Sequence, residues 1–274
     1  MKKAQKIIKY LAIAFGLYLA INIIGWIIFG ATLLLGIDLG LDAISEGKTV
    51  KTIDYTETFS DVEKLDIQIN AANFEIKVGE ELKVELINIS ENAKVKLEDK
   101  TLKIKDAKLG WNINLKETPT VILYIPGNMK LSEAKIEMGA GTTDIEYLNT
   151  EKLDLRLGAG QVKINNCTAT QSDIECGAGK VEIKNANLQN LELNTGIGEF
   201  TYHGYILGNS KIECGIGKLI LDLQGGKDSY FINADHGIGR ITINGEKLQD
   251  NKTVGSGENK IKIDGGIGEI QIKM

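Results

Sequence analysis

The chain has 274 residues and a net charge of −5, with 43% hydrophobic and only 6% aromatic residues. Glycine is frequent, at 31 residues, whereas proline occurs twice. Outside the extreme N-terminus no Lys/Arg-rich stretch could follow a phosphate backbone, so the sequence excludes nucleic acid as a partner. The only histidines are His203 and His236, which makes a histidine-based metal site unexpected.

Residues 1–37 have the pattern of a membrane anchor. The chain opens with four lysines, Lys2, Lys3, Lys6 and Lys9. Residues 11–37 then carry no charge, and about 20 apolar residues are enough to cross a bilayer as a helix. A cleaved secretory signal has a shorter apolar stretch, so we expect one uncleaved transmembrane helix. The lysines before it and the acids after it (Asp38, Asp42 and Glu46) predict a cytoplasmic N-terminus and an extracellular C-terminal domain.

After a predicted juxtamembrane linker, 38–61, a Gly-x-Gly motif returns at a regular spacing. We call each copy a knot, and the copies begin at Gly139, Gly158, Gly177, Gly196, Gly215, Gly237 and Gly266. The first four steps are identical in length, and the last two are longer. Apolar and polar residues alternate on both sides of the knots, as in "LDLRLGAGQVKI" at 153–164, which indicates strands. A period of about 20 residues is typical of solenoids, whose rungs bury their apolar faces against one another.

The segment before the first knot predicts a degenerate rung followed by hairpins. "LDIQINAANFEI" at 65–76 aligns with 153–164 without a gap and has Asn-Ala-Ala in place of the knot. Residues 81–106 alternate without knots, and turns at 90–92 and 98–100 predict antiparallel hairpins. The expected fold is therefore all-β, a parallel β-solenoid of about 19-residue rungs over 62–274 with a hairpin-rich N-terminal segment.

The knots are expected to be sharp corners, because glycine adopts a positive φ without steric cost and lets backbones stack closely. We therefore expect a positive φ at Gly177, for example. The middle residue of the knots is, in chain order, Ala140, Ala159, Ala178, Ile197, Ile216, Ile238 and Ile267. These side chains either fill a widening interior, which is the simpler interpretation, or form an exposed apolar ridge for a partner or for self-association.

No catalytic, cofactor or metal site is predicted. A strand follows the knots where a dinucleotide fingerprint needs a helix, and "GAGKV" lacks the hydroxyl residue of a P-loop. The calcium nonapeptide needs an Asp where Ile270 stands. Cys176 and Cys214 share a column two rungs apart, about 9.6 Å, which is too far for a disulfide. Cys167 is expected in a turn without a partner.

The polar residues also favour structural roles. Asp235–His236 is the only candidate acid–base pair, and adjacent strand residues point to opposite faces, so a structural histidine is expected there. Tyr202-His203 is expected to end a strand. One outward column mixes acids, a base and an amide, which predicts a self-neutralising, solvated face. Its members are Glu137, Arg156, Glu175, Asn194 and Glu213.

These features resemble a bacterial family of β-strand-repeat ectodomains, the toast-rack family, whose members are described as candidate adhesins. The resemblance rests on the stretch 81–106, on "VILYIPGN" at 121–128 and on the knots from Glu137 to Leu219, and it covers roughly 62–274. It implies a β-solenoid, often tethered to a membrane, association with envelope-stress systems and no established enzymatic activity. It offers no catalytic residues.

The sequence thus predicts a non-enzymatic, membrane-tethered module that binds or senses an envelope protein or polymer. Its other expected partner is membrane lipid, through the N-terminal helix, and no cofactor is expected. The second interpretation is an adhesin or a self-assembling surface scaffold, which leaves oligomerisation open. A polysaccharide-active enzyme comes third, because it needs clustered carboxylates and here the outward acids are interleaved with Lys and Arg.

Overall fold

The structure, a computed structural model, describes residues 51–106, 118–248 and 252–274. They belong to one compact unit made of strands and a short 3-10 turn, η1 (Lys227–Ser229), so the all-β prediction is confirmed. The predicted anchor and most of the predicted linker lie outside these residues. Within the described ranges, no helix has both the length and the apolarity needed to cross a membrane.

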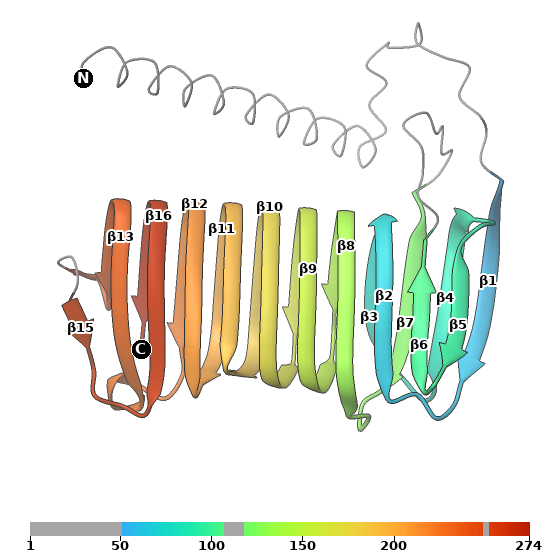
Figure 1. Cartoon of the computed structure of the whole chain (residues 1–274), viewed down its shortest axis with the longest axis horizontal. Helices are drawn as coiled ribbons and strands as arrows, with labels where there is room; N and C mark the ends of the chain where they lie inside the picture. The colour runs from blue at the N-terminus through green and yellow to red at the C-terminus, as the bar shows by residue number, and fades with distance from the viewer. Residues whose placement is uncertain (1–50, 107–117, 249–251) are drawn as a thin grey trace, which may run out of the picture. The chain divides into compact units, whose positions relative to one another are not determined.

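The main body of this unit is a stack of parallel strands (Figure 1). In spatial order they are β8 (Leu131–Ile145), β9 (Leu148–Asn165), β10 (Cys167–Gln189), β11 (Leu191–Leu207), β12 (Asn209–Leu223), β16 (Asn259–Lys273) and β13 (Tyr230–Ile243). Neighbouring strands of the stack place their knots side by side, so that Ala159, for example, lies between Ala140 and Ala178. Parallel pairing with equivalent residues in register is the arrangement of a β-solenoid, as the repeat predicts.

The last rungs do not follow chain order. β16 lies between β12 and β13 and pairs in parallel with both. The chain therefore leaves β12, forms the outermost rung first, and returns to fill the gap. On the way back, β14 (Glu246–Lys247) and β15 (Lys252–Val254) pair antiparallel with the two ends of β13. This return path accounts for the two longer steps at the end of the repeat.

The other end of the stack is a mixed sheet. Its strands are β1 (Thr52–Phe59), β2 (Lys64–Ala71), β3 (Asn73–Gly79), β4 (Leu82–Ser90), β5 (Lys94–Glu98), β6 (Thr101–Lys105) and β7 (Thr120–Pro126). β2 and β3 form the predicted degenerate rung and pair in parallel with β8. β1 lies within the stretch 38–61, for which the sequence predicts a linker.

Only one of the two predicted hairpins forms. β5 and β6 pair antiparallel across the turn at 98–100, as expected. The hairpin at 90–92 is wrong, because β4 pairs with β1 and β7 and not with β5. The two strands of the first rung, β2 and β3, extend into separate parts of the sheet. β6 pairs with β2 and β5 with β6, whereas β7, β4 and β1 follow one another outward from β3. The turn at 90–92 therefore carries the chain from one side of the core to the other.

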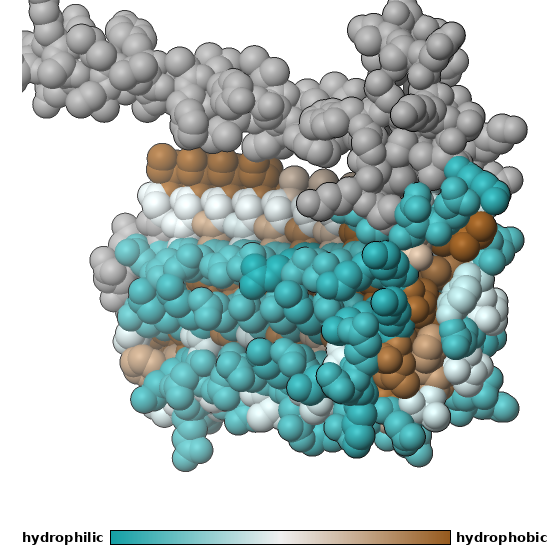
Figure 2. Space-filling model, turned by 45° about the vertical axis from the view of Figure 1, so that its right-hand side comes forward, coloured by the Kyte–Doolittle hydropathy of each residue, from teal (hydrophilic) through white to brown (hydrophobic). Residues whose placement is uncertain are grey.

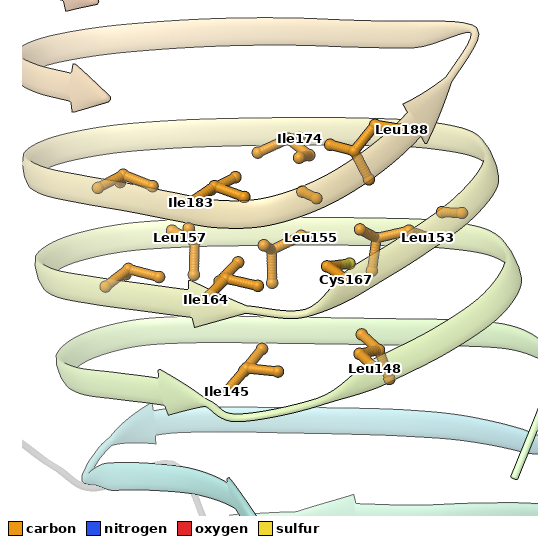
Figure 3. Close-up of a cluster of buried hydrophobic side chains, with 14 of the residues drawn as sticks. Ile145, Leu148, Leu153, Leu155, Leu157, Ile164, Cys167, Ile174, Ile183 and Leu188 are labelled. Carbon is orange, nitrogen blue, oxygen red and sulfur yellow. The ribbon is translucent and has the colours of Figure 1, made fainter. Parts of the chain in front are cut away.

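The core is continuous along the stack because the same rung position is apolar in successive strands (Figure 3). One column is completely buried from Leu155 through Ile174, Leu193, Ile212 and Ile263. Burying one such side chain contributes about 1.5–3 kcal/mol. Cys167 begins β10 and is buried in this core, which corrects the expectation that it lies in a turn.

Candidate functional site

The knots form one edge of the stack, and their glycines are required by the closeness of neighbouring backbones. The second glycine has a positive φ, +139° at Gly179, whereas Gly177 does not, contrary to expectation. A Cβ atom on Gly177 would nevertheless lie 2.3 Å from the carbonyl oxygen of Gly158. On Gly179 it would lie 1.9 Å from the carbonyl oxygen of Gly160. The first position therefore requires glycine because a Cβ atom would clash with the neighbouring backbone. The second requires it for the same reason and because of its positive φ.

Between the two glycines, the middle side chain points out of the corner. The exposed fractions are 38% for Ile197, 50% for Ile216, 49% for Ile267 and 70% for Ile238. These residues lie side by side on β11, β12, β16 and β13, and we call them the isoleucine ridge. Figure 2 shows a hydrophobic row along this edge, next to a pale row. These four side chains therefore do not fill an interior, and the exposed position that the second interpretation predicts is confirmed.

The charged side chains beside the ridge are paired with one another. In the position after the knot, Lys180 Nζ lies 3.1 Å from Glu199 Oε1, and Arg240 Nη2 lies 2.6 Å from Glu269 Oε1. Hydrogen bonds from Gln271 and Arg240 lower the pKa of the Glu269 carboxyl, so this acid stays ionised. Such exposed pairs contribute at most about 1 kcal/mol each, but they leave the border of the ridge with little net charge.

A broad polar face lies before the knots. The outward column predicted from the sequence is in register across β8 to β12. Arg156 bonds Asp154 at 3.1 Å and Glu175 at 2.8 Å, and Lys135 lies 2.9 Å from Glu137 on the same strand. Neutralisation by ion pairs is thus confirmed for these residues. The pairs form between neighbouring strands and also between alternate residues of one strand.

An open groove of about 1010 Å³ runs over this polar face. Side chains of successive strands line it, and they include Gln68, Glu137, Arg156, Glu175 and Asn194. The groove therefore offers amide, carboxylate and guanidinium groups in a row. This chemistry suits hydrogen bonding to a polar ligand.

His203 has partners at both ring nitrogens. Its Nδ1 lies 3.0 Å from Asp222 Oδ2, and its Nε2 lies 3.0 Å from the side-chain nitrogen of Gln224. We assign Nδ1–H as the donor to Asp222 and Nε2 as the acceptor from the amide, so neither nitrogen is free to act as a base. β11 continues to Leu207, beyond the strand end expected at Tyr202-His203. The backbone of His236 pairs with that of Gly265, and its side chain lies outside the described atoms.

The cysteines are free, as predicted. Burial raises the pKa of Cys167 and Cys176 to about 12 and that of Cys214 to about 11, where a hydrogen bond with Thr195 acts in the opposite direction. Protonated thiols are poor nucleophiles and poor metal ligands. In the part of the chain that the structure describes, no group of three His, Cys, Asp or Glu side chains could hold a metal ion.

Together, the in-register rungs, the glycine corners and the mixed N-terminal sheet define a β-solenoid-like repeat domain. Residues 62–273 match the family Toastrack DUF4097, and the chain belongs to this family. The sequence has no significant match among curated proteins.

Three crystal structures are similar over most of the chain. A candidate cell adhesion protein from Clostridium sporogenes has 19% identity, covers 81% of this chain and 99% of its own, and has a TM-score of 0.35. A candidate adhesin from Bacteroides fragilis has 18% identity, coverages of 82% and 100%, and a TM-score of 0.38. A candidate lipid binding protein from Parabacteroides distasonis has 16% identity, coverages of 82% and 98%, and a TM-score of 0.33. At this level of similarity, their names say nothing about what this chain binds.

Proposed function

We propose that the chain is a non-enzymatic, membrane-tethered module of the bacterial cell envelope that binds or senses an envelope protein or polymer. The groove on the polar face carries the proposal. There, Glu137, Arg156 and Glu175 repeat the same outward position on neighbouring strands. Neighbouring strands lie about 4.8 Å apart, so the face offers polar groups at a regular short interval. Such a surface suits an extended partner and spreads the contact energy over several rungs.

The state of the polar groups supports binding over catalysis. Two of the three acids that line the groove, Glu137 and Glu175, are paired with Lys135 and Arg156. A glycosidase needs one carboxyl that is held protonated and another that is free to attack or to activate water. His203, with Asp222 and Gln224 on its ring nitrogens, is likewise occupied.

The tether rests on the lysines at the start of the chain and on the uncharged run 11–37. By the excess of lysines before the run, they favour a cytoplasmic N-terminus and a described domain outside the cell. A protease added to wall-free cells should therefore digest the chain after residue 48. Full protection of that part would reverse the orientation.

Charge reversal tests the polar face. We expect the full chain in detergent micelles to sediment with isolated cell-wall polymer, or to cross-link to an envelope protein in intact cells. The triple variant Glu137→Lys/Glu175→Lys/Glu213→Lys should lose this binding. The matched control Glu151→Lys/Glu182→Lys/Glu246→Lys makes the same charge change outside the outward column of the polar face and should retain the binding. Circular dichroism checks that both variants are folded.

An alanine scan of the outward polar residues distinguishes a binding module from an enzyme, with survival under envelope stress as the readout. Partial losses spread over neighbouring positions support binding. One folded point variant that is inactive, such as a single carboxylate or His203→Ala, with its neighbours unaffected, would instead identify an enzyme.

A further inference from the structure

The isoleucine ridge is an apolar, protruding edge that the polar groove does not use. Its four side chains stand in a single row at the apex of the corner, on neighbouring strands. Glycines flank each of them, so no side chain of the knot itself shields the row. Contiguous exposed apolar surface on a folded domain usually marks a contact with a partner or a membrane.

The register of the sheet shows where the chain enters the domain relative to this edge. Thr120 on β7 lies opposite Asn73, which directly follows the corner of the first rung at 70–72. Ile87 on β4 lies opposite Thr120, and Thr52, the first residue of β1, lies opposite Ser90 a few residues further along β4. The chain therefore enters at the knot edge, and in Figure 1 β1 begins at the end of the sheet where the rungs bend.

The distance to the predicted anchor is short. Residues 38–51 separate the uncharged run from β1, and about 14 residues span at most roughly 50 Å when fully extended. If the anchor crosses the membrane as proposed above, the linker joins the domain at the knot edge, so this edge is within reach of the bilayer. Two further exposed isoleucines, Ile53 and Ile87, lie near the entry point on the same edge.

We propose that the isoleucine ridge docks on the extracellular leaflet of the membrane that carries the anchor and inserts its side chains among the lipids. This inference rests on the tether of the proposed function. Tethering keeps the ridge at a high effective concentration near the bilayer, so a weak individual insertion is enough for a stable contact. The domain then lies along the membrane with its knots down and its polar face accessible.

The charges beside the ridge indicate which lipids suffice. Lys180 is paired with Glu199, and Glu269 is shared by Arg240 and by Lys218, which lies 3.8 Å away. Three cations therefore face two acids, and the border offers at most one surplus positive charge to anionic headgroups. Docking is therefore apolar in origin, proceeds on zwitterionic lipid and is insensitive to salt.

A second copy of the chain fits the ridge less well. The four exposures amount to the surface of about two fully exposed isoleucines. A stable protein interface buries about 800 Å² per partner, which is about twice the exposed area of the ridge. A convex row one residue wide is also a poor match for a second convex row, whereas lipid chains adapt to its shape.

Single-tryptophan variants of the full chain test the contact. With Trp26→Phe and Trp111→Phe as the background, Ile238→Trp places the probe on the ridge. Phe231→Trp is the matched control, because Phe231 is an exposed residue near the start of the same strand, well before the knot. Both variants are reconstituted in phosphatidylcholine vesicles in which part of the lipid carries brominated acyl chains, a short-range quencher.

We expect the Ile238→Trp variant to emit at shorter wavelength and to lose most of its emission to brominated lipid, at low and at high salt. The Phe231→Trp variant should emit as in water and be quenched little. Equal, water-like emission from both variants would overturn the proposal. A short-wavelength emission at 238 without quenching would also overturn it, because protein then covers the ridge.

Flotation separates this inference from the proposed function. If the chain floats with the vesicles but the ridge probe is unquenched, the tether stands and only the ridge contact fails. If the chain does not float, the tether fails and the ridge contact fails with it.

Discussion

The two halves of the knot edge have the same backbone and different side chains. In β8, β9 and β10 the middle residue is alanine, and in β11, β12, β16 and β13 it is isoleucine. The spacing between rungs is unchanged: a Cβ atom would lie 1.9 Å from the preceding carbonyl oxygen at Gly160, at Gly198 and at Gly217. The fold thus demands the glycines and leaves the residue between them free. Isoleucine in one half is therefore not explained by core packing, which makes a contact outside the domain the better explanation.

The largest expected effect comes from substituting the knot glycines, which both halves of the edge share. Gly179→Ala and Gly217→Ala should each destabilise the domain by about 3 kcal/mol or more, because each adds an unfavourable φ and an overlap with a backbone oxygen. Denaturant unfolding of the full chain measures the change. An unchanged midpoint for either variant would mean that the rungs can separate at the knots without cost.

The second effect follows from the thiols. Their ordinary pKa is 9.0, and burial raises it to about 12 at Cys167 and Cys176 and to about 11 at Cys214. Above pH 9 the unfolded thiols ionise while the folded ones stay protonated, so this stability is present below pH 9 and is lost towards pH 11–12. The loss is about 1.4 kcal/mol per pH unit for each thiol in that window. Unfolding curves at pH 8 and pH 10 should differ accordingly, and less so in the Cys176→Ala/Cys214→Ala variant.

Beneath the edge, the two halves are expected to behave alike. Cys176→Ala in the alanine half and Cys214→Ala in the isoleucine half should each cost on the order of 1 kcal/mol, from the space vacated by the sulfur. A reducing agent should leave the unfolding midpoint of the parent chain unchanged, since the cysteines are free. A redox-dependent shift in gel mobility assigned to this pair would contradict the register of the rungs.

The smallest expected effects come from substituting the middle residue of a knot, where the two halves of the edge differ. Ile216→Ser and Ala159→Ile exchange the character of one ridge position in each direction, at a site that points outward. Both should change the free energy of unfolding by less than about 0.5 kcal/mol. Thermal unfolding measures this change, and a large loss in either variant would show that the middle residue serves the fold after all.

The repeat was predictable because each rung residue stacks on its own equivalent one period away, so the sequence period is also the structural register. The same logic could have found the contact of His203 with Asp222, which lies one rung further on. Other features leave no periodic signal. The pairing of β1 with β4 joins segments that are distant in the sequence and share no motif, and the turn at 90–92 looks like that of an ordinary hairpin.

The direction of the ridge side chains was not predictable either. Alternation along a strand shows which side chains face the core only while the pleat is regular. The bend at the knot interrupts the pleat, so the alternation before it does not predict which way the middle side chain points. Ile197 therefore could be placed on neither side from Thr195 or Phe200 alone. The position of β16 escaped prediction for a related reason: the two longer steps show that the period breaks, but not which rung lies next to which.

The insertion of the last strand has a consequence for how the protein is made. Until residues 259–273 have been synthesised, β12 lacks its outer neighbour and β13 lacks the parallel strand beside it. Exposed strand edges promote aggregation and proteolysis, so a chain that lacks β16 is not expected to form a stable domain. A version that stops after residue 257 should accumulate as aggregates or proteolytic fragments, whereas the full chain does not.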